Sequence, residues 1–212
     1  MFSPHDPYLM HARSDKKAMK LRLAHALTLL AFGAAASTQA ADRGAATATL
    51  NGKKVTIDYG RPSLKGRSMD DLLKQLPADR IWRAGENQVT TLSTETDLVV
   101  GGKTVKAGKY SVYVHAPATG DWAIVLNSDL GIPLGKIWDG APANMKNEPW
   151  PHYQDYSKSV AAQEVVRTPL TSGKSKAPAE QFTIDLAPKA DAAALTLAWG
   201  EKTWSTELKA AK

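Results

Sequence analysis

Tight-turn dipeptides set between short alternating segments constrain this chain more than any other feature. Asn51-Gly52 divides residues 47–59, and Gly101-Gly102 divides residues 98–105. Residues of these types accept the positive φ angles that a two-residue β-hairpin turn requires. In the first segment the apolar side chains alternate and therefore share one face of a strand: Val55, Ile57 and Tyr59. The pattern predicts two antiparallel hairpins.

The same period-two alternation continues along most of the chain. Further strands are predicted over residues 109–115, 122–127, 160–168, 181–186, 194–199 and 203–208. We expect Gly200-Glu201 to form a tight turn between the last two strands, and residues 171–178 to form a solvated loop. Many short strands of this kind indicate an all-β fold, an antiparallel β-sandwich of jelly-roll type.

One short helix interrupts the predicted strands. Ser68 is placed to cap its start, Asp71 lies in its first turn, and Pro77 ends it after about nine residues. Four apolar side chains form a stripe along it: Met69, Leu72, Leu73 and Leu76. The stripe predicts a small lid that packs on a sheet.

Residues 1–40 have the architecture of a secretory signal peptide. The basic segment 16–22 precedes a short apolar run, 27–36, and Thr38-Gln39-Ala40 places small residues before a cleavage point after Ala40. Met19 opens a shorter segment of the same design, so either Met1 or Met19 is the start of translation. We expect an exported protein, periplasmic or secreted, with no integral membrane span after signal removal.

Residues 41–212 are predicted to form a single β-sandwich domain. This part holds 22 Lys and Arg against 19 Asp and Glu, a net charge of +3 compared with +6 for the whole chain. A charge this small does not favour a nucleic-acid partner. The chain contains no cysteine, so apolar burial rather than disulfide bonds must stabilise it outside the cytoplasm.

Two basic segments flank the predicted helix, YGRPSLKGRS at residues 59–68 and IWRAGENQVTT at residues 81–91. If they converge at one rim of the sandwich, they can hold a carboxylate or phosphate, because guanidinium groups bind these anions bidentately. The candidate ligand-binding residues are Arg61, Lys65, Arg67, Arg83 and Asn87. The alternative is a scaffold, in which the cations only pair with nearby acids: Asp70, Asp71, Asp79 and Glu86.

A long segment without periodicity, residues 128–159, is the second candidate surface. It is rich in aromatic residues, whose rings stack on sugar faces while amides and carboxylates bind the hydroxyl groups. The candidates are Trp138, Trp150 and Tyr153. The alternative is that these rings, with Tyr156, anchor a long loop to the sandwich.

Motifs for catalysis or metal binding are missing from residues 41–212. Only two histidines occur, His115 and His152, and they form neither an H-E-x-x-H nor an H-x-H pattern. No nucleophile elbow, phosphate-binding loop or dinucleotide fingerprint occurs either. We therefore predict no catalytic residue, metal or cofactor, and expect His115 to be exposed.

Four motifs together resemble a known family. They are YGRPSLKGR (59–67), IWRAGEN (81–87) with Thr90, KAGKY (106–110) and WAIVLN (122–127). In their order and spacing the chain resembles the domain-of-unknown-function 2911 family of exported bacterial proteins, over residues 45–208. The family pattern commonly reads WR-x-GANEAT, whereas Glu86 stands here in place of a small residue and Gln88 in place of an acid. The resemblance implies an exported β-sandwich with no established activity.

Three functions remain open on the sequence. The first is a non-enzymatic envelope binding module, with the basic segments holding an anionic small molecule or a cell-wall glycan. The second is an envelope hydrolase acting on a glycan or ester, with Glu86 and Asp70 as its carboxylates. The third is a structural or partner-binding sandwich that uses a strand edge or the aromatic segment. The oligomeric state is left open by all three.

Overall fold

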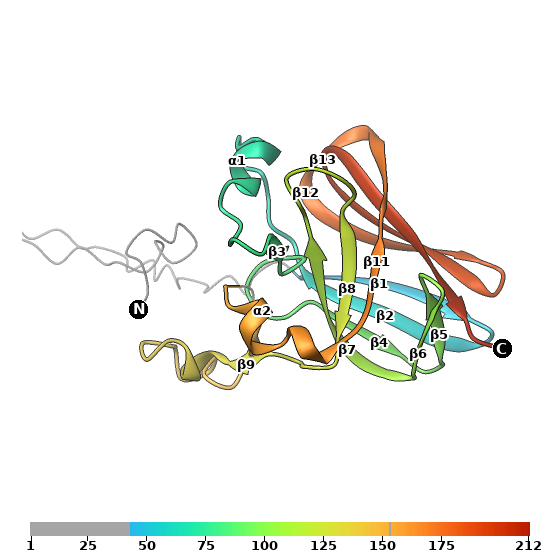
Figure 1. The fold of residues 1–212 in the computed structure, drawn as a ribbon, viewed down its shortest axis with the longest axis horizontal. Helices are drawn as coiled ribbons and strands as arrows, with labels where there is room; N and C mark the ends of the chain where they lie inside the picture. Colours follow the sequence, from blue (N-terminus) through green and yellow to red (C-terminus); the bar gives the residue numbers. More distant parts are fainter. Residues whose placement is uncertain (1–42, 153) are drawn as a thin grey trace, which may run out of the picture. The chain divides into compact units, whose positions relative to one another are not determined.

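Two antiparallel sheets make up most of the chain in a computed structural model that describes residues 43–152 and 154–212 (Figure 1). The predicted signal peptide and Tyr153 lie outside these described residues. The larger sheet has the strand order β1 (Arg43–Leu50), β2 (Lys53–Gly60), β4 (Thr91–Thr94), β7 (Gly108–His115), β8 (Ala123–Asn127) and β11 (Glu164–Pro169), with β3 (Ile81–Trp82) paired to β7. The smaller sheet has the order β12 (Thr171–Lys189), β13 (Ala192–Ala210), β5 (Leu98–Val100) and β6 (Lys103–Val105).

The two sheets face each other across one apolar core, as a sandwich and not as a closed barrel. The predicted inward rows are all buried in this core: Val55, Ile57 and Tyr59 from β2, Phe182, Ile184 and Leu186 from β12, and Leu195, Leu197 and Trp199 from β13. Each strand therefore contributes one apolar face, as period-two alternation requires. The predicted antiparallel β-sandwich is confirmed.

Both predicted hairpin turns are confirmed. Asn51 and Gly52 have φ angles of 50° and 76°, and Gly101 and Gly102 have φ angles of 57° and 78°. Two successive positive φ angles define the type I′ turn, whose twist matches that of the flanking strands. Each dipeptide joins neighbouring antiparallel strands, β1 to β2 and β5 to β6.

The predicted turn at Gly200-Glu201 is wrong, because β13 runs through it without reversing. The predicted loop over residues 171–178 is wrong as well, since these residues begin β12, and residues 171–174 pair with β13. Gly200 has a φ of 60° and marks a bulge, where the pairing jumps from Lys174 opposite Lys202 to Ala179 opposite Gly200. A glycine at positive φ suits a bulge as well as a turn, and only the partner strand decides between them.

Short helical segments connect the strands. In α1 (Met69–Leu73) the Ser68 hydroxyl accepts a hydrogen bond from the Asp71 amide at 3.1 Å, which confirms the predicted cap. The α-helix is only five residues long, shorter than predicted, and it buries Leu72 against the core. A second short helix, α2 (Tyr156–Ser159), was not predicted. Two 3-10 turns are η2 (Leu134–Lys136) and η3 (Ala161–Gln163).

The aromatic segment leaves the larger sheet after β8 and returns at β11. It contains a two-stranded ribbon of β9 (Ile132–Pro133) and β10 (Pro149–Trp150), followed by α2. Figure 1 shows the ribbon, in yellow, extending beyond the strands of the sandwich. The segment is therefore loop-rich, as expected, but it also contains regular structure in the β9–β10 ribbon and in α2.

Candidate functional site

The two basic segments meet through their backbones. A Cβ added to Gly60 would lie 2.8 Å from the Glu86 amide nitrogen and closer still to the Glu86 carbonyl oxygen. A Cβ added to Gly85 would lie 3.0 Å from the Gly60 carbonyl oxygen. Only glycine, which has no Cβ, permits two segments of the chain to approach each other this closely. We call this place the loop junction; it comprises Gly60, Arg61, Gly85 and Glu86, together with Arg43, which stands opposite Gly60, and with Arg83 and Asn87, which flank Gly85 and Glu86 in the second segment.

Arg61 lies at the edge of the loop junction with its side chain half-buried. Its Cδ atom would be 2.8 Å from a Cβ on Gly44, so the aliphatic part of the side chain crosses β1 beside the ring of Tyr59. The Arg61 carbonyl accepts a hydrogen bond from Gln181 Nε2 at 3.2 Å. The backbone at Arg61 is therefore tied to the smaller sheet.

Arg83 and Asn87 lie on the second segment, on either side of Gly85 and Glu86. Arg83 is 7% exposed, and Asn87 is half-buried in the left-handed region with a φ of 60°. The loop between them is held internally, because the Thr90 hydroxyl donates to the Ala84 carbonyl at 2.9 Å. A buried guanidinium beside a fixed loop has little conformational entropy left to lose on binding.

Arg67 and Lys65, also predicted as ligand contacts, are engaged differently. Arg67 donates from Nε to the Leu64 carbonyl at 2.9 Å and from Nη2 to the Ser63 carbonyl at 2.8 Å. Its guanidinium therefore closes its own loop through backbone carbonyls, and not through an acid as the scaffold alternative expected. Lys65 is exposed at a φ of 51°, and its backbone amide donates to the Glu180 carboxylate at 2.7 Å.

Arg43 is part of the junction but was not among the predicted residues. Its Nε donates to Asp58 Oδ1 at 2.8 Å, its Nη2 also contacts that oxygen, and Nη2 reaches the Val89 carbonyl at 3.2 Å. The β1–β2 register places Arg43 directly opposite Gly60. That register is the only signal that could have revealed it, since Arg43 stands 40 positions before Arg83 in the sequence.

The aromatic candidates that the structure describes differ in their exposure. Trp138 is 36% exposed, Trp150 is half-buried, and Tyr153 lies outside the described residues. The β9–β10 ribbon, which includes Trp150, is attached to the second basic segment, because the Val89 amide donates to the Pro149 carbonyl at 3.0 Å. A Cβ on Gly131 would lie 2.6 Å from both Val89 Cγ2 and the Trp150 carbonyl oxygen.

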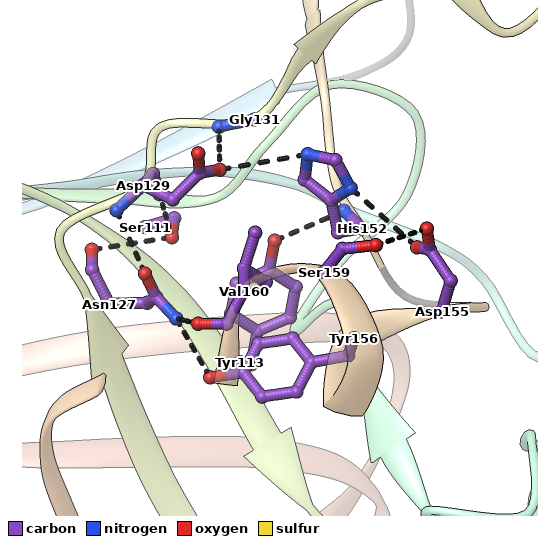
Figure 2. Close-up of polar contacts among 10 residues, drawn as sticks. All are labelled: Ser111, Tyr113, Asn127, Asp129, Gly131, His152, Asp155, Tyr156, Ser159 and Val160. Carbon is purple, nitrogen blue, oxygen red and sulfur yellow. Dashed lines mark hydrogen bonds and ion pairs between the residues drawn. The ribbon is translucent and has the colours of Figure 1, made fainter. Parts of the chain in front are cut away.

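A polar cluster that the sequence did not reveal anchors the far end of the aromatic segment (Figure 2). Asn127 is fully buried at the end of β8, and its Nδ2 donates to the Tyr156 hydroxyl at 3.1 Å and to the Val160 carbonyl at 2.7 Å. Its Oδ1 accepts from the Asp129 amide at 2.8 Å. Tyr156 also packs edge-on against Tyr113, with ring centroids 4.7 Å apart. For Tyr156, the anchoring alternative is therefore the one that the contacts support.

His152 lies between two carboxylates in the same cluster, as Figure 2 shows. Its Nε2 is 3.7 Å from Asp129 Oδ1, and its Nδ1 is 3.6 Å from Asp155 Oδ1. The backbone amide of His152 donates to the Tyr113 hydroxyl at 3.1 Å. The imidazole thus joins the start of the aromatic segment to the residues before α2.

The hydroxyl groups near His152 do not form a nucleophile and base pair with it. Ser159 donates to Asp155 Oδ2 at 2.5 Å, whereas the imidazole contacts the other carboxylate oxygen, Oδ1. The Ser111 hydroxyl donates to the Asp129 carbonyl at 2.6 Å. Nucleophilic catalysis requires the hydroxyl to contact the base itself. The cluster has the contacts of an anchor.

Burial changes the titration of three groups near this cluster. It raises the pKa of Tyr113 to about 12 and raises the pKa of Tyr156 even further above its usual range. His115 is half-buried at the end of β7, contrary to the expected exposure, and burial together with Arg167 lowers its pKa. Desolvation favours the uncharged form in all three cases.

Two further properties limit the chemistry of the described residues. Across 43–152 and 154–212, no group of three or more His, Asp or Glu side chains is arranged to hold a metal ion. In the same residues, no helix combines the length and apolar character needed to cross a membrane.

The fold is an antiparallel β-sandwich in which two arginine-bearing segments meet through their backbones at the loop junction. Residues 41–208 match the model of a family described as a protein of unknown function, DUF2911, and the chain belongs to this family. The predicted membership is confirmed. Searches of curated proteins and of solved structures give no match.

Proposed function

We propose that this protein is an exported, non-enzymatic binding module of the cell envelope, periplasmic or secreted, whose loop junction holds an anionic small molecule or an anionic group of a glycan. The close backbone contact of Gly60 with Glu86 is the observation that carries the proposal. It brings the segments that bear Arg61 and Arg83 to one place, although 21 positions separate Gly60 from Ile81 in the sequence.

The chemistry of the junction suits a carboxylate or phosphate. Arg61 and Arg83 carry planar donors in a fork that matches two anionic oxygens, and Asn87 adds an amide. Arg43 supplies a third guanidinium and is itself held by Asp58 and the Val89 carbonyl. Because the loops are fixed before the ligand arrives, little ordering is required on binding.

The test uses the full chain expressed with its own leader. N-terminal sequencing of the exported protein is expected to show that it begins at Ala41. Calorimetric titration is then run with inorganic phosphate and with trigalacturonate. Arg61→Gln removes one guanidinium charge while keeping most of the side chain. Its matched control is Arg167→Gln, which removes an exposed guanidinium that is paired with Glu164 on β11.

We expect Arg61→Gln to weaken anion binding at least tenfold and Arg167→Gln to leave it within twofold. Arg67→Lys serves as a second comparison, because Arg67 holds its own loop and its change is expected to lower the melting temperature rather than act on the ligand directly. Equal affinity in wild type and Arg61→Gln, with both proteins folded, would refute the proposed site.

A further inference from the structure

The register of β12 and β13 places two lysines directly opposite each other. Lys174 pairs with Lys202, and both side chains are exposed. Directly opposed residues of an antiparallel pair share a face, and like charges in these positions repel. Neither lysine forms an ion pair within the described part of the chain. We refer to Lys174 and Lys202 as the lysine pair.

The lysine pair lies on the side of the strands that elsewhere faces the core. Side chains alternate along a strand, so Lys202 shares its face with Trp204, which is buried. The bulge at Gly200 shifts the alternation by one residue, so that Trp199 on its other side is also buried. Lys202 therefore stands in an inward row between two buried tryptophans and yet remains exposed.

A tryptophan stack flanks the lysine pair on each side. Trp122 stacks on Trp204 with ring centroids 4.1 Å apart and planes at 7°. Trp82 stacks on Trp199 with centroids 5.4 Å apart and planes at 16°. The outer ring of each stack, Trp122 or Trp82, is only half-buried.

We propose that the lysine pair and the two tryptophan stacks form a second binding site, for a ligand that joins a carboxylate or phosphate to a sugar or aromatic ring. One anionic group placed between two ammonium groups relieves their repulsion, and a flat apolar face of the ligand can pack against the half-buried rings. The site uses none of the loop-junction residues and goes beyond the proposed function.

The competing explanation is that the lysines protect an edge strand. β12 pairs only with β13 and so has one free edge, and lysine is a common residue for preventing unwanted pairing there. At Lys202 the same holds for β13, because β13 pairs with β5 only over residues 208–210. Edge protection accounts for an exposed lysine on either strand, but it does not require two lysines to stand directly opposite each other, where they repel. The direct opposition is better explained by an anion held between them.

The experiment measures binding to the exported protein by tryptophan fluorescence. Three probes separate the required features: trigalacturonate has charge and rings, inorganic phosphate has charge alone, and maltotriose has rings alone. The variant is Lys174→Gln with Lys202→Gln. The matched control is Lys53→Gln with Lys54→Gln, which removes two exposed lysines from β2.

We expect trigalacturonate to bind wild type at least tenfold more tightly than either other probe and to change the fluorescence. The double variant should lose at least tenfold in the affinity reported by tryptophan fluorescence, while the control stays within twofold. Without ligand, Lys202→Gln alone should melt at a higher temperature than wild type, since the repulsion is gone.

Three results would overturn the second site. One is equal affinity for trigalacturonate in wild type and the double variant. Another is an equal loss of affinity in the control with Lys53→Gln and Lys54→Gln, which would show that the effect follows net charge and not the lysine pair. The third is no fluorescence or melting response of wild type to either charged probe at millimolar concentration.

Discussion

Replacing Gly60 by alanine tests the contact on which the loop junction depends. Gly60 does not have a positive φ, so alanine can adopt its backbone conformation without strain. The new Cβ would nevertheless lie 2.8 Å from the Glu86 amide nitrogen and 2.9 Å from the Glu86 carbonyl carbon. Both are backbone atoms, which cannot rotate away as a side chain can, so one of the two loops must move.

The expected cost follows from this overpacking. Steric insertion into a well-packed site costs roughly 1–3 kcal/mol. A clash between the new Cβ and the backbone atoms of Glu86 belongs at the upper end of this range, about 3 kcal/mol. For a domain of this size that corresponds to a fall in melting temperature of roughly 6–12 °C. Urea denaturation followed by circular dichroism gives the free energy of unfolding, and calorimetry gives the melting temperature.

Gly66→Ala is the matched control from the same loop. A Cβ at Gly66 would meet nothing within 4 Å, but its φ is 75°. Its cost is therefore conformational only, about 1 kcal/mol. If Gly60→Ala destabilised the protein no more than Gly66→Ala does, the close contact between the loops would be wrong, and the proposed ligand site would lose its geometry.

Other predictions concern the polar cluster, the tyrosines and the helix cap. Asn127→Leu should lower the free energy of unfolding by about 3 kcal/mol, because the Asp129 amide and the Val160 carbonyl lose their partners; a change below 1 kcal/mol in urea denaturation would contradict this. Because the folded pKa of Tyr113, about 12, exceeds its ordinary value of 10.0, the unfolded state releases this proton first. The contribution of Tyr113 to the free energy of unfolding is therefore complete below pH 10 and falls as the pH rises to 12. Tyr113→Phe should flatten this decline in the free energy of unfolding with pH. An unchanged pH dependence in the variant would count against the burial argument. Ser68→Ala should cost about 1 kcal/mol through loss of the bond to the Asp71 amide, whereas Ser68→Asp should retain most of the stability; equal losses in both variants would exclude a capping role.

Local features of the structure were predictable because their causes lie within a few residues. The hairpins at Asn51-Gly52 and Gly101-Gly102 follow from residues that accept positive φ, and the Ser68 cap follows from a hydroxyl three positions before an amide. The inward rows follow from alternation alone. In each case the interaction is short-range and does not depend on which strand becomes the neighbour.

Site residues were predicted less completely, because their roles depend on partners far along the chain. Arg67 was grouped with Arg61 by spacing, yet its guanidinium binds carbonyls of its own loop. Arg43 joined the junction through strand register, and His152 met Asp129 and Asp155 through a turn of the aromatic segment. Charge and composition carry no information on these pairings.

The sequence by itself determined the family, the all-β class, the hairpin turns and the apolar rows, since each arises from local backbone preference or from alternation. Only the tertiary structure decided that Gly200 makes a bulge rather than a turn, and that Lys174 consequently stands opposite Lys202. It also decided that Gly60 touches Glu86. The physical reason is that register, bulges and loop contacts depend on the packing of the whole core, and the same local residues are compatible with more than one such arrangement.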